Sequence, residues 1–377
     1  MKIAVTTLVS CVAALLALSM VMLYSSGMAQ ASGTRHMMMQ LIWAAMGLVL
    51  CVTVASNDYQ HLKKLAWPIF IIALILLVLV LVPGIGRKIN GARRWFDFGG
   101  IRFQPSELAK LALIIILAWY GERCQRQMDT WKRGILLPGI IIGSMLGLIF
   151  IEPDRGTTIL LAAVAGAMLL IAGVKMKYVI PPFLLGAVAL GVSLFHDPVR
   201  AKRIFSWINL EESKSGTGYQ AYQAMLALGS GGWTGLGLGN GRQKLGFIPE
   251  HRTDFIFAVI GEELGLIASL LVVLAFVLIV ACGVFISARA RDKFGLLMGV
   301  GVTFLIGLQA FINIGVVTST LPNKGLPLPF VSYGGSNLLA MLVCVGILLS
   351  IARNARERET ELAIPGRAAD FSTAHAT

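Results

Sequence analysis

Long apolar runs dominate this chain and restrict what it can fold into. About ten of them meet the requirement of roughly 20 apolar residues for a helix that crosses a membrane. Their centres lie near Ala14, Gly47, Ala73, Ile114, Ile142, Ala165, Val188, Leu271, Phe304 and Leu342. Only 14% of the residues are charged, against roughly 25% in soluble domains. The sequence therefore predicts an all-α, polytopic membrane protein with about ten transmembrane helices.

The first apolar run imitates a secretion signal. Lys2 precedes it, and Ala29-Gln30-Ala31 has the composition of a cleavage site. However, the run from Ile3 to Tyr24 exceeds the roughly 7–15 residues of a signal core and can span a bilayer. We therefore expect an uncleaved first helix.

Basic residues indicate which side each short connection faces. With a cytoplasmic N-terminus, every short inner connection is basic, as the positive-inside rule requires. These residues are Lys63, Lys64, Arg123, Arg126, Lys132, Arg133, Lys175, Lys177, Arg289, Arg291, Lys293, Arg353, Arg356 and Arg358. The sequence predicts a membrane domain over residues 1–353 and a polar cytoplasmic tail over residues 354–377, with both termini inside.

The net charge indicates the chemistry of the partners that the chain could bind, and the cysteine spacing bears on metal binding. The formal charge of +13 suits anionic lipid head groups or phosphorylated substrates. The five cysteines are scattered through apolar runs and short loops without the spacing of a metal site. We interpret them as small core residues.

One predicted outer loop is basic against the positive-inside rule. Between the third and fourth runs, the only acidic residue near the basic cluster is Asp97. The basic residues are Arg87, Lys88, Arg93, Arg94 and Arg102. Topology alone would place such charges inside, so their position predicts a bound anion, and guanidinium pairs suit phosphate oxygens. Contact with lipid head groups is the alternative.

The predicted extracytoplasmic connection over residues 196–254 is far longer than the usual loop of roughly 4–6 residues. Its opening residues 200–207 mix basic and aromatic side chains and suit a membrane interface. The glycine-rich segments 229–232 and 235–241 permit tight turns and close backbone approach. They lack the Gly-Lys-Ser/Thr ending of a phosphate-binding loop, so we expect function or internal structure of another kind.

Ionisable residues lie where this connection enters the eighth apolar run. Arg252 and Asp254 precede the run, and Glu262 and Glu263 follow two turns inside it. Carboxylates at or below a membrane surface are costly, so they predict a functional site. A helix cap formed by Thr253 or Asp254 is the alternative at the start of the run.

Two more patches place carboxylates near predicted helix starts. Glu107 and Lys110 are three residues apart on one helix face, where they can form an ion pair, and they make the fourth run the weakest by hydropathy. Glu152 and Asp154 lie in a short turn between two runs. Each pair can line a site. A purely structural ion pair and a solvated turn are the respective alternatives.

The last patch interrupts the helical pattern before the tenth run. Three prolines and three glycines between residues 322 and 337 prevent a continuous helix, so this segment must be buried in protein or line an aqueous cavity. Lys324 and Ser332 belong to it. Gln309 and Asn313, four residues apart in the preceding run, share a face and are expected to bond across helices.

In this order, the patches resemble the SEDS family of polytopic cell-wall proteins (shape, elongation, division and sporulation), which includes FtsW and RodA. The resemblance covers the chain from the first run to about residue 353. Its strongest blocks are residues 91–110, 152–158, 229–265 and 322–337. Lys324-Gly325-Leu326-Pro327-Leu328-Pro329-Phe330 looks more like the division branch, FtsW, than the elongation branch.

The resemblance implies a peptidoglycan glycosyltransferase that polymerises lipid II at the outer face of the bacterial cytoplasmic membrane, for septal wall synthesis. It also implies a class B penicillin-binding protein as transpeptidase partner, further division or elongation proteins, and no nucleic acid. A RodA-like elongation polymerase is the alternative within the family. A lipid II flippase without covalent chemistry also fits the broken helices and buried charges. A scaffold that only recruits a transpeptidase is a third interpretation.

The family's essential aspartate falls on Asp254, to which we assign the general base for the acceptor hydroxyl. Arg93, Arg94 and Lys324 are predicted to bind the departing diphosphate. The other candidate substrate-binding residues are Glu107, Lys110, Glu152, Asp154 and Ser332. The resemblance implies inversion at the anomeric carbon. A divalent cation (Mg²⁺ or Mn²⁺) is compatible with this chemistry, although the sequence offers no dedicated ligand set, and no other cofactor is expected.

Two positions depart from the family pattern. Arg252 occupies the position before Thr253-Asp254 where the family usually has histidine, so a histidine role cannot be transferred to it. Arg155 replaces the leucine of the family turn Glu-Pro-Asp-Leu-Gly and adds a positive charge near the predicted phosphate site.

Overall fold

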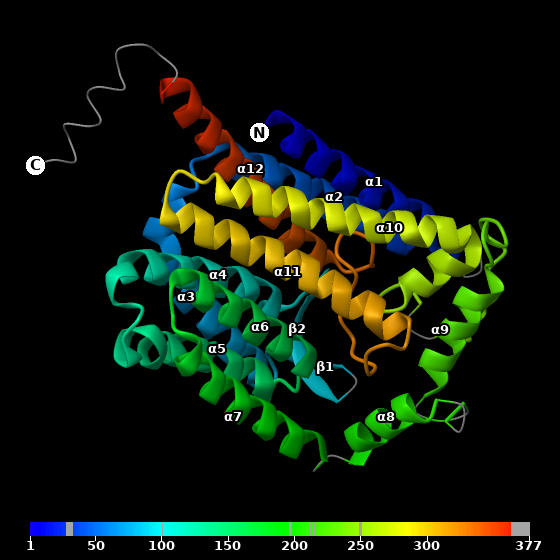
Figure 1. The fold of residues 1–377 in the computed structure, drawn as a ribbon. Helices are drawn as coiled ribbons and strands as arrows, with labels where there is room; N and C mark the ends of the chain where they lie inside the picture. Colours follow the sequence, from blue (N-terminus) through cyan, green and yellow to red (C-terminus); the bar gives the residue numbers. More distant parts are fainter. Residues whose placement is uncertain are drawn as a thin grey trace, which may run out of the picture.

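Long helices make up most of the computed structural model, which describes residues 1–27, 33–89, 91–99, 101–195, 198–210, 213–214, 216, 218–248 and 251–362 (Figure 1). The elements, in chain order, are α1 (Lys2–Gly27), α2 (Gly33–Ser56), α3 (Gln60–Leu81), β1 (Arg87–Ile89), β2 (Ala92–Phe98), β3 (Ile101–Phe103), α4 (Pro105–Arg123), η1 (Gln125–Gln127), η2 (Lys132–Leu136), α5 (Leu137–Ile151), α6 (Arg155–Ala172), α7 (Met176–Phe195), α8 (Pro198–Ile208), α9 (Tyr219–Ser230), η3 (Gln243–Leu245), α10 (Ile256–Ala288), α11 (Lys293–Val317) and α12 (Gly335–Leu362).

Each of the ten predicted spans corresponds to a helix, namely α1 to α7 and α10 to α12. Among the residues that the structure describes, eight helices are long and apolar enough to cross a membrane. The fourth, α4, is not among them because it carries charges at both ends, and α7 contributes only the shorter apolar helix Met176–Ala189. The prediction of a helical, multi-pass membrane protein is confirmed. The predicted boundary at residue 353 falls inside α12, which continues to Leu362.

The charged helix α4 lies at the centre of the bundle. It packs against α3, α5, α6, α11 and α12. Nearly every residue from Pro105 to Ala118 is buried. The charges of its first turn therefore face protein rather than lipid, which is where ionisable side chains in membrane helices are tolerated.

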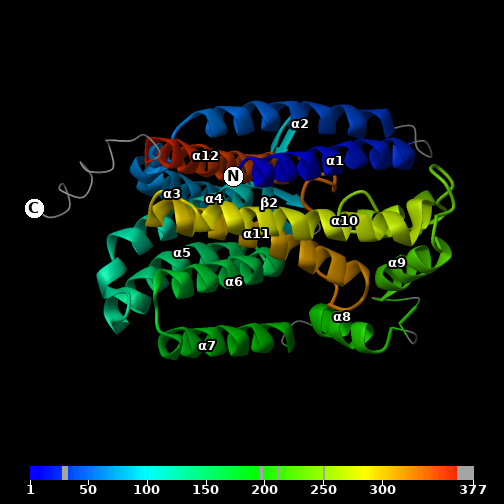
Figure 2. The same ribbon diagram turned by 45° about the horizontal axis from the view of Figure 1, so that its top comes forward.

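α7 and α8 lie apart from this core, at one side of the bundle (Figure 2). Phe183 and Leu185 of α7 are 66% and 72% exposed, as expected for a helix surrounded by lipid. Trp207 of α8 donates its indole N–H to the carbonyl of Ser319 (2.8 Å). This bond joins the predicted long connection to the segment that follows α11.

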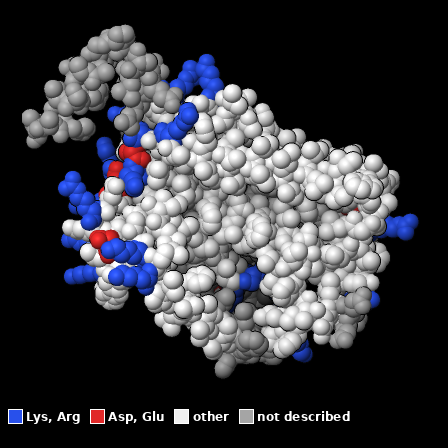
Figure 3. Space-filling model, in the orientation of Figure 1, with Lys and Arg blue, Asp and Glu red and all other residues white. Residues whose placement is uncertain are grey.

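Polar contacts gather at two ends of the bundle. At one end, Asp292 accepts hydrogen bonds from Tyr59 Oη (2.9 Å) and from Gln60, and Lys63 pairs with Glu122 (2.5 Å). Figure 3 shows most of the visible lysine and arginine side chains on this side of the molecule. The other end holds the sheet, α8, α9, the 152–154 turn and Asp254, and we refer to it as the Asp254 end.

A small antiparallel sheet, in the order β1-β2-β3, departs from the all-α prediction. Its register pairs Ile89 with Ala92 and Lys88 with Arg93. Two sequence signals for it were present, since Asn90-Gly91 and Gly99-Gly100 are dipeptides typical of hairpin turns. The strands are too short and too rich in arginine for their periodicity to stand out between long apolar runs.

We predict that Gly346→Leu destabilises the bundle. α12 packs along α2, and a Cβ at Gly346 would lie 2.7 Å from the carbonyl oxygen of Cys51. Overpacking typically costs about 1–3 kcal/mol, so the thermal unfolding midpoint in detergent should fall by several degrees.

The control is Gly147→Ala in α5, where nothing lies within 4 Å of an added Cβ. It should unfold at or above the wild-type midpoint, because glycine weakens a helix interior by about 0.5–1 kcal/mol. Equal midpoints for all three proteins would contradict the close packing of α2 and α12.

Candidate functional site

Asp254 lies in the turn that leads into α10. This helix begins at Ile256, and its N-cap position is Phe255, which makes no side-chain cap. Neither Thr253 nor Asp254 occupies the cap position, so the cap interpretation does not hold for this helix. Asp254 is half-buried, whereas the residues that follow are fully buried. Pro249 and Glu250, which precede this turn in the sequence, lie outside the described residues.

The segment between α11 and α12 binds the backbone on the N-terminal side of Asp254. Ser332 Oγ donates to the carbonyl of Thr253 (2.5 Å), and the N–H of Tyr333 donates to the carbonyl of Arg252 (2.9 Å). Ser332 Oγ also accepts the N–H of Leu328 (2.8 Å). Ser332 therefore joins the proline-rich segment to the turn that carries Asp254.

Two amides of α11 bind the same segment from the opposite side. Asn313 Nδ2 donates to the carbonyls of Asp254 (2.8 Å) and Leu326 (2.7 Å). One turn earlier, Gln309 Nε2 donates to the carbonyl of Pro327 (2.9 Å). The prediction of bonds across helices is confirmed for Gln309, which accepts a hydrogen bond from Lys110 of α4, whereas Asn313 binds non-helical backbone. The non-helical segment is largely buried in protein, as its backbone requires.

Gly325 borders the carboxylate of Asp254. A Cβ at this position would lie 2.5 Å from Asp254 Oδ2, so glycine permits the contact. The neighbouring Lys324 is partly buried, and this burial lowers the pKa of its ammonium group. Leu326 packs against Gly156 in the first turn of α6. One short segment therefore links Asp254 with the turn that holds Glu152.

The predicted ion pair between Glu107 and Lys110 forms, with Nζ 2.8 Å from Oε2. Both side chains are buried, at 5% and 1% exposure. Lys110 Nζ also donates to Gln309 Oε1 (3.0 Å), and Asn337 Nδ2 donates to Glu107 Oε2 (3.0 Å). Through Gln309 the pair is connected to the proline-rich segment beside Asp254.

The turn between α5 and α6 is not solvated, so that alternative is wrong. Glu152 and Asp154 are 0% and 4% exposed. Asp154 caps α6 by accepting the N–H and the hydroxyl of Thr157 (3.2 and 3.0 Å), and it also accepts Gln104 Nε2 (3.2 Å). The role of Asp154 at a helix start follows from this geometry.

Glu152 is the unusual carboxyl of the site. Both of its side-chain oxygens are buried without a hydrogen-bond partner among the described residues. Burial, and then the nearby charge of Asp154, raise the pKa of Glu152 to about 8, although Arg94 opposes the shift. Arg94 donates Nε to the carbonyl of Glu152 (2.9 Å) and Nη2 to that of Pro153 (2.5 Å). The Glu152 carboxyl is therefore largely neutral at pH 7.

The basic cluster divides into paired and unpaired members. Arg87 and Arg102 both contact Asp97. Lys88 and Arg93 face each other across the hairpin, and no described acidic side chain pairs with either. Like charges directly opposite each other destabilise a sheet, so a bound anion would relieve this repulsion.

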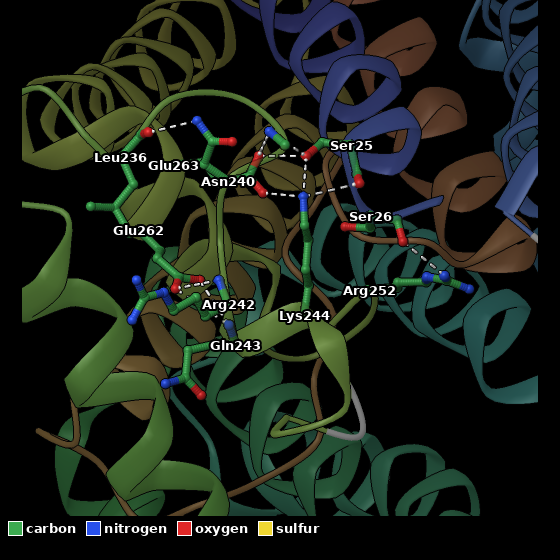
Figure 4. A network of polar contacts seen from close by, with 11 residues as sticks. Ser25, Ser26, Leu236, Asn240, Arg242, Gln243, Lys244, Arg252, Glu262 and Glu263 are labelled. Atoms are coloured by element: carbon green, nitrogen blue, oxygen red, sulfur yellow. Dashed lines mark hydrogen bonds and ion pairs between the residues drawn. The ribbon is translucent and has the colours of Figure 1, made fainter. Parts of the chain in front are cut away.

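Arg252 and Arg155 are the two residues that depart from the family pattern, and both make side-chain contacts. Arg252 Nη2 donates to the carbonyl of Ser26 (3.0 Å, Figure 4), and its Nη1 lies 3.2 Å from His36 Nδ1. Arg155 stacks over the ring of Phe150, with 3.4 Å from its Cζ to the ring centroid. Arg252 thus links the Asp254 turn to α1 and α2.

The described part of the site offers no ready-made metal centre. Within it, no group of three or more His, Cys, Asp or Glu side chains could hold a metal ion. The buried pair Glu262 and Glu263 binds the glycine-rich part of the long connection rather than the Asp254 turn.

We predict that Glu152→Gln flattens the pH dependence of stability. The folded-state pKa of about 8 lies above the ordinary carboxyl value of about 4.3. The folded protein thus binds more protons between these values, and the free energy of unfolding falls as pH rises through this range. The variant should unfold about 4 °C above wild type at pH 8.5 and close to it at pH 5, measured by thermal unfolding. A difference between the two proteins that stays constant with pH would contradict the burial argument.

Known proteins resemble this chain along most of its length. Residues 6–357 match the family model of the FtsW, RodA and SpoVE proteins, described as "Cell cycle protein". The "Probable peptidoglycan glycosyltransferase FtsW" of Trichlorobacter lovleyi is 39% identical, over 90% of this chain and 91% of that protein. "Stage V sporulation protein E" of Bacillus subtilis is 38% identical, over 84% of this chain and 87% of that protein.

Solved structures agree with these relatives. A chain from a peptidoglycan synthase complex, described as coordinating polymerization and crosslinking, has a TM-score of 0.78 at 27% identity and covers 92% of this chain and 97% of its own. The rod shape determining protein RodA of Thermus thermophilus has a TM-score of 0.69 at 28% identity, over 92% of this chain and 96% of that chain. The resemblance inferred from the sequence is confirmed: the chain belongs to the FtsW/RodA/SpoVE family of multi-pass membrane proteins.

Proposed function

We propose that this protein is a peptidoglycan glycosyltransferase that polymerises lipid II at the outer face of the bacterial cytoplasmic membrane, in septal wall synthesis. The observation that carries the proposal is the convergence at the Asp254 end, where one buried segment connects Asp254, Lys324 and the Glu152 turn. Relatives named FtsW glycosyltransferases support the same reaction and the division branch.

Asp254 is the proposed general base. Chain growth requires a sugar hydroxyl to attack an anomeric carbon while a lipid diphosphate leaves. A positioned carboxylate that removes the hydroxyl proton contributes typically about 10²–10⁴-fold to the rate. Asp254 suits this role because its backbone is held by Asn313, whereas its side chain stays partly accessible. Direct displacement with inversion at the anomeric carbon accompanies this assignment.

Cations at the same end are proposed to bind the diphosphate. Lys324 adjoins Gly325, which touches the Asp254 carboxylate. Arg93 lacks a described acidic partner and faces Lys88 across the hairpin. Arg94 uses Nε and Nη2 on the carbonyls of residues 152 and 153, so it contributes mainly charge. Fixed cations in a partly dehydrated site stabilise a departing anion without reorganising.

The remaining candidates are proposed to shape the site. Glu107 and Lys110 satisfy each other and orient Gln309, and Ser332 orients the Asp254 turn. Asp154 fixes the start of α6, and Glu152 beside it is a buried carboxyl without a hydrogen-bond partner among the described residues. These contacts favour supporting roles for Glu107, Lys110 and Ser332.

The charge distribution supports the proposed orientation, and a solved complex supports the proposed partner. The exposed Lys175 and the partly exposed Lys63 and Arg353 lie at the end opposite Asp254, which supports a cytoplasmic location for that end and for both termini. A class B penicillin-binding protein is the proposed partner, because a similar chain occurs in a complex that coordinates polymerization and crosslinking. Other division proteins, and a divalent cation (Mg²⁺ or Mn²⁺) as activator, complete the proposal.

Asp254→Asn should abolish polymerisation. The variant keeps the shape of the side chain and removes the base, so the initial rate on lipid II should fall to about 1% of wild type or less. Purified protein, with and without the cognate transpeptidase, is assayed for glycan chains. Asp129→Asn, an exposed carboxylate that pairs with Lys175 at the opposite end, serves as control and should keep full activity. Transfer of lipid II between leaflets without any glycan product would favour the flippase instead.

Gly325→Ala should slow polymerisation without loss of fold. The added methyl group collides with Asp254 Oδ2 and displaces the carboxylate, and a misplacement of about 1 Å can cost about 100-fold in rate. The assay is the polymerisation rate at saturating lipid II. Gly143→Ala in α5, with open space around the added Cβ, should behave as wild type. Wild-type activity of Gly325→Ala would show that the carboxylate position is not critical.

A further inference from the structure

The helix that follows Asp254 is broken near its start. Gly265 has φ 78° and ψ −173°, far from helical values, so α10 consists of a short half-helix (residues 256–264) and a long helix after the break. Residues 256 to 263 of the half-helix are all buried. A break of this kind removes backbone hydrogen bonds that must be replaced inside protein or membrane.

The glycine-rich part of the long connection (residues 231–244) replaces these bonds. The N–H groups of Leu236 and Gly237 donate to the carbonyls of Glu262 (2.9 Å) and Glu263 (3.0 Å). On the other side of the break, the N–H groups of residues 266 and 267 donate to the carbonyls of residues 232 and 233 (2.9 and 3.3 Å). The segment therefore binds both halves of α10 through its backbone, and we name it the clamp segment.

Glycine is required where the clamp segment meets the half-helix. A Cβ at Gly231 would lie 1.9 Å from the carbonyl oxygen of Gly261, and one at Gly235 would lie 2.2 Å from that of Glu263. A Cβ at Gly241 would lie 2.8 Å from Glu263 Oε1. Close backbone approach to the half-helix thus explains glycines that match no phosphate-binding motif.

The two buried glutamates extend the contact with their side chains. Glu262 Oε1 accepts the N–H groups of Arg242 (2.7 Å) and Gln243 (3.3 Å). Glu263 Oε2 accepts the N–H of Gly239 (3.1 Å) and the hydroxyl of Ser25 in α1 (2.5 Å). The cost of burying these carboxylates is offset by bonds to the clamp segment and α1.

Lys244 donates hydrogen bonds to both the half-helix and α1. Its Nζ donates to Glu263 Oε1 (2.6 Å), to Ser25 Oγ (2.8 Å) and to the carbonyl of Ser25 (3.1 Å), as Figure 4 shows. These three acceptors satisfy all three donors of an ammonium group. The side chains of Lys244 and Glu263 are 1% and 0% exposed. The pair joins the clamp segment, the half-helix and α1 at one point.

We propose that Lys244 is a positioning residue for the glycosyl transfer reaction: its bonds to Glu263 and Ser25 hold the clamp segment on the half-helix and thereby set the position of Asp254. The half-helix and the turn before it are continuous, and Phe255 and Ile256 between them are buried. A displacement of the half-helix therefore moves the Asp254 backbone. The inference rests on the proposed role of Asp254 as base.

The first test is hydrogen exchange of the full chain in detergent, read by mass spectrometry over residues 231–244 and 256–266. Lys244→Met keeps an aliphatic stem of similar length and removes the three donors, so both segments should exchange faster while α3 and α12 keep wild-type protection. Arg242→Met removes an equal charge from the same segment. The Arg242 side chain is exposed, so this control should exchange as wild type. Wild-type protection in Lys244→Met would overturn the proposal.

The second test separates positioning from substrate binding. In lipid II polymerisation, Lys244→Met should lower kcat by up to about 100-fold and change KM by less than about 2-fold, because the base is misplaced while the diphosphate ligands remain. If Lys244→Met cannot be purified folded, Glu263→Gln carries the same tests, since it removes the charge that pairs with Lys244 and preserves volume. Faster exchange with an unchanged kcat would also overturn the positioning role.

The two tests distinguish failure of this inference from failure of the proposed function. If Asp254→Asn polymerises lipid II normally, the role of Asp254 is wrong whatever Lys244 does. If Asp254→Asn is inactive and Lys244→Met has wild-type kcat and exchange, the function stands and Lys244 is not a positioning residue.

Discussion

A single constraint organises this molecule: polar groups inside a membrane protein must find partners within the protein. The backbone is non-helical at two places near Asp254, the break at Gly265 and the proline-rich segment before α12. Side-chain amides of α11 satisfy the second, and the clamp segment satisfies the first. The amides of α11 bind the turn that carries Asp254 directly, whereas the clamp segment binds the half-helix that follows this turn. The cost of leaving such groups unpaired in a medium without water explains why the partners are so numerous.

The same constraint distinguishes charged side chains that bind other protein groups from charged side chains that can still bind a ligand. Lys110 and Lys244 are fully buried, and each has several acceptors within hydrogen-bond distance. Lys324 is only partly buried and lies next to the Asp254 carboxylate contact, so it remains suited to a ligand. Glu152 is the exception, since it is buried and, within the described chain, unpartnered. A group of this kind is retained at the cost of stability, which is expected at functional sites rather than in structural cores.

The sequence predicted many residues of the site, but it did not predict which of them contact one another. The ion pair of Glu107 and Lys110 followed from their spacing, because residues three apart share a helix face. The partner of that pair did not follow, because Gln309 approaches it from a helix distant in the chain. Glu263 illustrates the same limit: its position in an apolar run indicated a function, but its contact with Lys244 depends on how a long connection folds back.

The sequence by itself determined the class of the protein. Apolar runs of bilayer length require membrane helices, and the order of the polar patches identified the family. Tertiary structure alone decided which polar groups meet. Lys244, Ser25 and Glu263 come from three separate segments, and Asn313 reaches Asp254 only because α11 lies beside the start of α10. Local periodicity specifies which face of a helix is polar. It cannot specify the neighbour of that face, because helix-to-helix contacts depend on packing across the whole bundle.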